Sequence, residues 1–225
     1  MFKGAVFGLT QKFLKCTLIP TMRWMIRNMI GRRRFLFSTT ILAAVGAATF
    51  GWAADAKDAE VLVANLVADI NTVISSGSSE SVMVRQFENI FKSYADVPTI
   101  ARYALGNDAR ALSKSQMKRF TKVYSVYVSH KYGRRFREFI GGKIVVQKSR
   151  PVKSFFEVET LAHLKGWEPF TVSFLVSNRS GRLLFFNMFI EGINMLLSER
   201  TEIGAMLDKR RGNIEKVMED LQNSI

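Results

Sequence analysis

The amino-acid sequence predicts an α+β fold, in which an antiparallel sheet of about four strands lies between N-terminal and C-terminal helices. Apolar residues recur at helical spacing before Gly141, alternate with period two from Lys143 to Ile190, and return to helical spacing from about Leu196. The connections between the strands are short, which favours an antiparallel meander. Helices followed by strands and then by further helices are typical of the α+β class.

The helices before the sheet are predicted from composition and from the spacing of apolar residues. Residues 59–74 have helical composition, and the Ser/Gly stretch at residues 75–79 indicates a turn. One apolar face of the next helix, with the spacing i, i+3, i+4, i+7, consists of Phe87, Ile90, Phe91 and Tyr94.

Several helix ends carry capping signals. The carboxylate of Asp96 is expected to accept hydrogen bonds from the first free amides of a short helix. Ser113 and Gln116 have the spacing of a capping box at the start of a longer helix. Near the C-terminus, Gly212 and Asn213 predict the end of one helix and the cap of the next.

The predicted strands cover residues 143–148, 152–164, 170–177 and 182–190. Arg150–Pro151 is expected to separate the first two strands. In the second strand Phe156 and Val158 alternate with Glu157 and Glu159, which predicts one apolar and one polar face. The last strand is apolar on both faces, so both sides are expected to be covered, or one to face a ligand or partner.

Residues 1–56 have the layout of an export signal. They begin with a segment that contains eight of the 33 basic residues, and no acid occurs before Asp55. An uncharged run at residues 35–54 and an A-x-A site at residues 54–56 come next, which is the order found in export signals. Cleavage would leave a domain at residues 57–225 in the periplasm. A retained anchor is the alternative, because a run of this length can just span a bilayer.

The export route is indicated by the sequence RRRFL at residues 32–36, which resembles the twin-arginine motif. Gly31 and Phe37 depart from the residues usually found beside that motif, so the Sec route stays open.

Motifs for catalysis are absent from the sequence, which predicts no enzyme, no metal and no cofactor. The single cysteine, Cys16, lies in the leader. Of the two histidines, His130 and His163, only His163 on a strand with two glutamates could serve the less favoured alternative of a lipid-modifying enzyme. The modest basic excess beyond the leader favours anionic lipid headgroups or an acidic partner protein rather than nucleic acid.

Short sequence blocks in a set order run along most of the chain. They are FENIF (87–91), DVPTIA (96–101), LG (105–106), Tyr132, KIVV (143–146) and FIEGINML (189–196) with Arg200. Together they make the stretch from about Val61 to Leu221 similar to the MlaC family, the periplasmic phospholipid-binding proteins also known from toluene-tolerance transport systems. Departures from the family occur at Ala109, Asn187 and Asn194.

This resemblance implies a curved antiparallel sheet and helices that enclose phospholipid acyl chains in an apolar cavity. It also implies a soluble auxiliary protein of an ABC transport system, which maintains outer-membrane lipid asymmetry. Its partners would be a phospholipid ligand, an outer-membrane lipoprotein complex and an inner-membrane ABC transporter complex. A relative associated with hopanoid biosynthesis makes a polycyclic lipid the nearest alternative cargo.

Helical faces and strand alternation give a set of candidate lining residues, for each of which ordinary core packing is an equally good interpretation. They are Phe91, Ile100, Leu105, Phe120, Tyr124, Tyr127, Val145, Phe156, Val158, Phe174, Val176, Phe186 and Met188.

Overall fold

A computed structural model of the protein describes residues 48–225, with side chains from Ala56 onwards except those of Phe136 and Arg137. Most of the predicted export signal therefore lies outside the described residues, and the predicted boundary at residues 56–57 falls within the first helix. Within the described part, no helix is long and apolar enough to cross a membrane.

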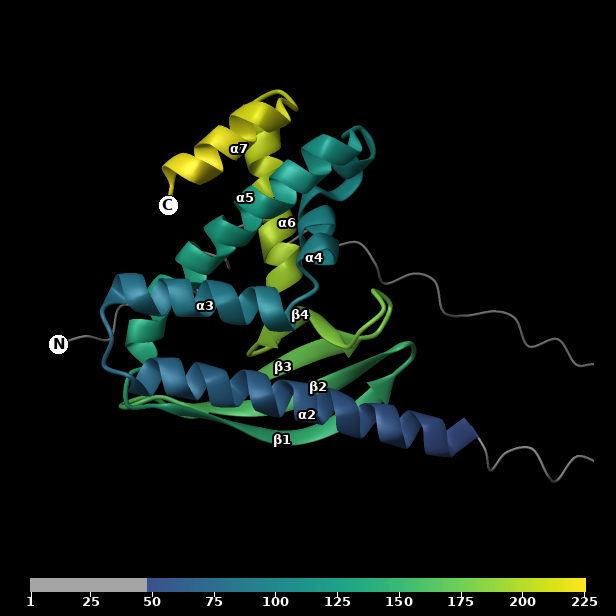
Figure 1. Ribbon diagram of the computed structural model, residues 1–225, viewed down its shortest axis with the longest axis vertical. Coiled ribbons are helices and arrows are strands. Elements are labelled where there is room, and N and C mark those ends of the chain that lie inside the picture. Colours follow the sequence, from purple (N-terminus) through teal and green to yellow (C-terminus); the bar gives the residue numbers. More distant parts are fainter. Residues whose placement is uncertain (1–47) are drawn as a thin grey trace, which may run out of the picture. The chain divides into compact units, whose positions relative to one another are not determined.

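The elements follow the predicted order of helices, sheet and helices (Figure 1). They are α2 (Ala48–Ser75), α3 (Glu80–Tyr94), α4 (Val97–Leu105), the 3-10 helix η1 (Gly106–Arg110), α5 (Lys114–Gly133), the 3-10 helix η2 (Arg134–Phe139), β1 (Lys143–Val152), β2 (Phe155–His163), β3 (Phe170–Ser177), β4 (Leu184–Ile190), β5 (Ile193–Asn194), α6 (Met195–Lys209) and α7 (Ile214–Asn223). This arrangement confirms the α+β prediction.

The sheet is an antiparallel meander with the strand order β1-β2-β3-β4-β5. Four strands match the prediction, and the fifth is a two-residue strand that pairs with the end of β4. At the other end of β4, Ala95 forms a parallel bridge with Phe185. The backbone groups on the outer edge of β4 thus pair with two different segments, Ala95 at one end and β5 at the other.

The predicted break at Arg150–Pro151 is wrong, because β1 continues to Val152 and turns only at Lys153–Ser154. Proline lacks an amide proton and is tolerated where a strand needs no partner on that side. β1 is the edge strand of the sheet, so Pro151 can pair with Phe156 through one side only. Lys153 adopts the left-handed backbone conformation that this turn requires, with a φ of 54°.

The capping predictions are confirmed. The Asp96 carboxylate accepts a hydrogen bond from the Thr99 amide at 3.2 Å and another from the Thr99 hydroxyl at 2.8 Å. Both hydrogen bonds of the capping box between Ser113 and Gln116 are present. Asn213 caps α7 through the Lys216 amide.

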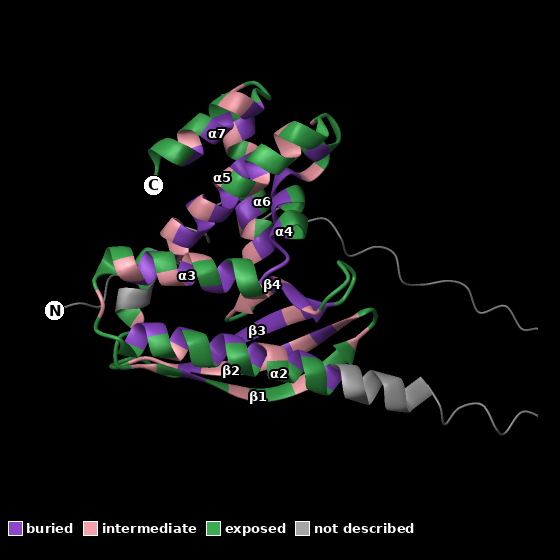
Figure 2. Ribbon diagram, in the orientation of Figure 1, coloured by how far each residue is buried: buried purple, intermediate pink, exposed green. Residues whose placement is uncertain are grey.

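Helix α2 lies along one face of the sheet, and α3 runs beside α2 (Figure 1). The amide side chain of Asn71 holds α2 to the start of β1, since it donates to the Ile144 carbonyl at 3.1 Å and accepts from the Ile144 amide at 3.0 Å. Helices α4, α5, α6 and α7 pack against one another, and α5 also packs against α3. Buried and exposed residues alternate along α2 and α3, as amphipathic helices over a core require (Figure 2).

A polar cluster joins α5 to α6 inside the helical part. The Glu199 side chain is 5% exposed and accepts hydrogen bonds from Tyr132 at 2.5 Å and Lys131 at 2.7 Å. Lys131 also binds Glu202, which accepts a second hydrogen bond from Tyr127. Burial is the main cause that raises the pKa of the Tyr124, Tyr127 and Tyr132 hydroxyls well above 10.

Alkaline solution is therefore expected to unfold the protein. A hydrogen bond to Asp69 is the main cause that raises the pKa of Tyr94 to about 12, so four of the five tyrosines hold their protons more tightly when folded. Stability from these groups is complete below the unfolded pKa of about 10 and is lost as pH rises above it.

A titration that follows tyrosinate absorbance together with circular dichroism checks this expectation. Most of the absorbance should appear only as the helical signal is lost. Ionisation of four tyrosines near pH 10 with an intact helical signal would contradict it.

Candidate ligand-binding site

One face of the sheet is apolar and lies toward the helices. In β2 the residues of this inner face are all buried, and the cross-strand register pairs them with inner residues of β3. The inner face consists of Ile144, Val146, Ser149, Pro151, Phe156, Val158, Thr160, Ala162, Phe170, Val172, Phe174, Val176, Phe185, Met188 and Ile190. Its polar members are Thr160 and Ser149. The Thr160 hydroxyl donates to the Val172 carbonyl at 2.8 Å, and the Ser149 hydroxyl donates to the Glu60 carboxylate of α2 at 2.8 Å. The face thus offers no charged group to a ligand.

The structure places Phe156, Val158, Phe174 and Val176 of the candidate set in this buried face. Met188 also belongs to it, opposite Phe174, and is partly exposed. These five residues lie together as the alternation predicted. Whether they contact a ligand stays a prediction.

Val145 lies on the opposite face of the sheet, against the prediction that it points inwards. It is 38% exposed, whereas its neighbour Ile144 is buried and pairs with the inner residue Ala162. Adjacent strand residues point to opposite faces, so only one of the two can line the interior. Because Ile144 and Val145 are both apolar, composition gave no way to choose between them.

A β-bulge in β4 exchanges the predicted roles of Phe185 and Phe186. The register shifts between the pairs Leu175–Asn187 and Val176–Phe185, which leaves Phe186 as the extra residue. Phe185 takes the inner position, with its ring 5.6 Å from that of Phe174. Phe186 instead packs edge-on against Phe155. Phe155 directly precedes Phe156 in β2 and points to the opposite face of the sheet.

The candidates on helices divide into two groups. Phe91 of α3 reaches the inner face, since its ring lies 6.2 Å from that of Phe185. Ile100 and Leu105 are buried in α4, which contacts β4 and α6.

Phe120, Tyr124 and Tyr127 of α5 pack with one another. Tyr124 and Tyr127 also form hydrogen bonds to glutamates of α6. These three residues belong to the core between the helices rather than to the inner face of the sheet.

Several inner-face residues remain partly exposed although they point toward the helices. They are Val146, Phe170, Met188 and Ile190, to which Phe139 of η2 adds its ring 6.4 Å from that of Phe170. The helices therefore leave part of this apolar face open to solvent. Phe170 and Ile190 were absent from the candidate set, although each continues an alternation that the set contains.

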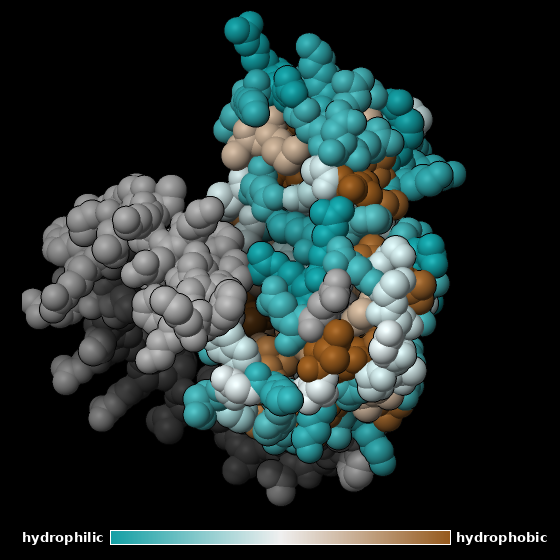
Figure 3. Space-filling view, turned by 90° about the vertical axis from the view of Figure 1, so that its left-hand side faces the viewer, coloured by the Kyte–Doolittle hydropathy of each residue, from teal (hydrophilic) through white to brown (hydrophobic). Residues whose placement is uncertain are grey.

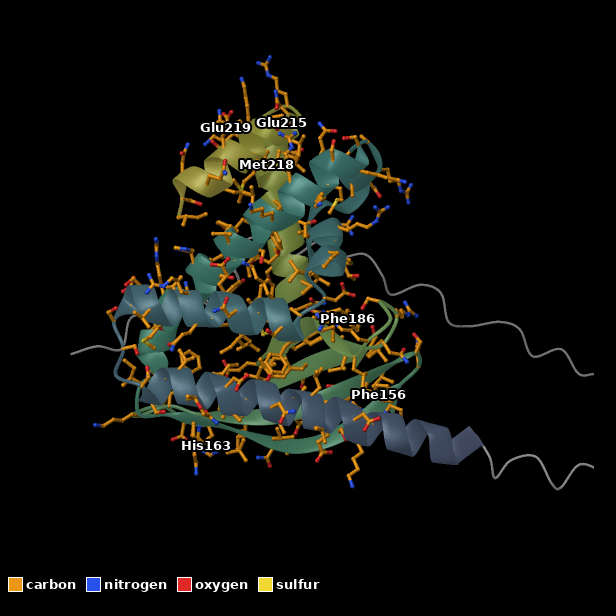
Figure 4. All side chains as sticks on the ribbon, in the orientation of Figure 1. Phe156, His163, Phe186, Glu215, Met218 and Glu219 are labelled. Carbon is orange, nitrogen blue, oxygen red and sulfur yellow. The ribbon has the colours of Figure 1, made fainter. Side chains whose placement is uncertain are left out.

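The groups that could support chemistry do not lie in this face. His163 ends β2 in the alternation of Glu157 and Glu159, on the side away from the helices (Figure 4). No group of three histidine, cysteine, aspartate or glutamate side chains among the described residues is arranged to hold a metal ion. The inner face is suited to contact with an apolar ligand.

An open antiparallel sheet with helices over an apolar, incompletely covered face defines the class of the protein: an α+β domain with a candidate site for an apolar ligand. The chain belongs to the MlaC family, because the family model described as MlaC protein matches residues 62–223.

Among solved structures, the chain is similar to a phospholipid-binding protein from Ralstonia solanacearum that was determined in complex with a phospholipid. The two chains are 14% identical with a TM-score of 0.64, and the match covers 74% of this chain and 96% of the other. At this identity the likeness shows a common fold. No curated protein sequence matches the chain significantly.

Proposed function

We propose that the protein is a lipid carrier that holds the acyl chains of a phospholipid between the inner face of its sheet and the covering helices. The observation that carries the proposal is the partial exposure of Phe170, Met188 and Ile190, three apolar side chains that point toward the helices. Membership of the MlaC family and the phospholipid in the similar Ralstonia protein support the same ligand class.

The physical reason for such a carrier is the cost of exposing acyl chains to water. Burying each CH₂ group is worth about 0.8 kcal/mol, so a diacyl lipid leaves a bilayer very slowly without help. An apolar face without charged groups can replace the bilayer around the chains. The polar headgroup would remain near solvent, where its charge keeps its hydration.

Transfer between vesicles tests the carrier function. Catalytic amounts of the protein should speed the movement of a fluorescent phospholipid from donor to acceptor vesicles, with a rate proportional to protein concentration. Bound lipid without any increase in the transfer rate would show that the protein binds lipid but does not transfer it, and would contradict the carrier function. Release of free fatty acid during the assay would instead support an enzyme.

The proposed place of action is the periplasm, where the protein would exchange lipid with an outer-membrane lipoprotein complex and an inner-membrane ABC transporter complex. The cationic and then apolar layout of residues 1–56 supports export. Replacing Arg32 and Arg33 with lysine tests the twin-arginine route. Accumulation of the precursor in the cytoplasm is expected, and unchanged export of the mature form would rule that route out.

A further inference from the structure

One end of the sheet carries two large exposed apolar side chains. Ile140, between η2 and β1, is 46% exposed, and Trp167, in the turn between β2 and β3, is 45% exposed. Gly166, with a φ of 81°, and the hydrogen bond from the Trp167 amide to the Leu164 carbonyl shape this turn. Tryptophan combines an apolar body with a polar N–H and is enriched where protein meets a membrane surface.

The segments that carry these two side chains lie against each other. A Cβ atom on Gly142 would lie 2.4 Å from the His163 carbonyl oxygen and 3.0 Å from Leu164 Cδ2. Only glycine allows this approach of the η2–β1 connection to the end of β2. Ile140 lies two residues before Gly142 and Trp167 four residues after His163, at the same end of the sheet, and we call the surface around them the Trp167 edge.

The Trp167 edge is continuous with the incompletely covered inner face. Phe139, directly before Ile140, contacts Phe170 edge-on, and Phe170 is the inner residue that begins β3. Ile190, also on the inner face, ends β4 at the same end of the sheet. The space-filling view of this side shows apolar side chains that reach the surface among hydrophilic ones (Figure 3).

Charged side chains flank the apolar pair. Lys143 begins β1 and Lys165 lies two residues before Trp167, while Arg135 lies in η2, and all three are exposed. Two exposed acids, Glu138 and Glu168, lie in the same two segments. The balance is slightly positive, and each lysine or arginine near an anionic membrane adds about 1 kcal/mol of attraction.

We propose that the Trp167 edge docks onto the surface of a phospholipid bilayer that contains anionic lipid, with Ile140 and Trp167 inserted among the headgroups. The inference rests on the proposed carrier function, because docking here would join the bilayer to the inner face through Phe139 and Phe170. Acyl chains could then move between membrane and protein along an apolar path instead of through water.

Fluorescence of Trp167 tests the proposal directly. The full chain has three tryptophans, so Trp24→Phe and Trp52→Phe leave Trp167 as the only emitter. Vesicles of phosphatidylethanolamine and phosphatidylglycerol should shift its emission to shorter wavelength, and brominated acyl chains should quench it. Because the signal comes from Trp167 itself, binding of the basic N-terminal segment alone cannot produce it.

Two variants in that background make the test specific. Ile140→Asp should raise the vesicle concentration at half-maximal shift by about tenfold, which corresponds to about 1.4 kcal/mol, since it removes an inserted apolar group. Val61→Asp replaces a side chain of α2 that is 50% exposed and should leave the shift unchanged. Equal effects of both variants would overturn the proposal.

An unchanged emission of Trp167 with vesicles would also overturn the proposal and leave the edge to a protein partner. The carrier function is judged separately, from the lipid that each purified variant contains. Bound lipid without the shift defeats the docking alone. A shift in protein that never contains lipid defeats the carrier function and, with it, the role proposed for docking.

Discussion

Ile190→Trp is expected to reduce the phospholipid that co-purifies with the protein by about tenfold or more. Ile190 points inward opposite Val172 and is only partly covered. An indole ring at this position would fill the space of two or three CH₂ groups of an acyl chain, each worth about 0.8 kcal/mol. A loss of about 1.4 kcal/mol corresponds to tenfold weaker binding.

The neighbouring residue supplies a matched control. Phe189 pairs with Ser173 on the opposite face of the same strand and is also partly exposed, so Phe189→Trp places the same indole ring on the other side of the sheet. Lipid phosphorus per mole of purified protein should fall for Ile190→Trp and stay at the wild-type level for Phe189→Trp. A parallel fall, or no fall in either, would mean that the inner face does not hold the lipid.

Glu199→Ala is expected to lower the free energy of unfolding by about 3 kcal/mol. The Glu199 carboxylate is buried and accepts hydrogen bonds from Tyr132 and Lys131, with Tyr124 at 3.4 Å. Removing it deprives the mostly buried Tyr132 hydroxyl of its acceptor, which is costly, while Lys131 keeps its ion pair with Glu202. Three residues of α5 contact Glu199 of α6 here, so the substitution is expected to weaken the packing between these two helices.

Urea denaturation measures this difference, and Glu215→Ala is its control. Glu215 pairs with Arg119 at 2.5 Å, but both side chains are largely exposed, at 44% and 58%. An exposed pair contributes at most about 1 kcal/mol. Similar midpoints for the two variants would show that the cluster around Glu199 does not stabilise the fold as inferred.

The parts of the fold that were predicted well depend on local interactions. Asp96, Ser113 and Asn213 cap helices through amides three residues away, so the sequence around each of them contains the whole signal. The alternation in β2 and β3 likewise needs only neighbouring residues. Pro151 could not be interpreted in this way, since its place in β1 depends on the edge position of that strand in the sheet.

The candidate site was predicted less well, because the residues that were predicted wrongly take their positions from contacts with residues far away in the sequence. The bulge that moves Phe186 away from the inner face is defined by pairing with β3. Tyr124 and Tyr127 fit an apolar helical face, yet their hydroxyls meet glutamates 75 residues further along the chain. A helical pattern cannot show which partner a hydroxyl group finds across the fold.

The most direct test of the proposed function is to identify what the protein contains. The protein is purified without detergent and extracted with organic solvent, and the extract is analysed by mass spectrometry. About one diacyl phospholipid per protein molecule is expected. A hopanoid in its place would change the cargo, and protein that is empty and also fails to take up phospholipid from vesicles would contradict the carrier altogether.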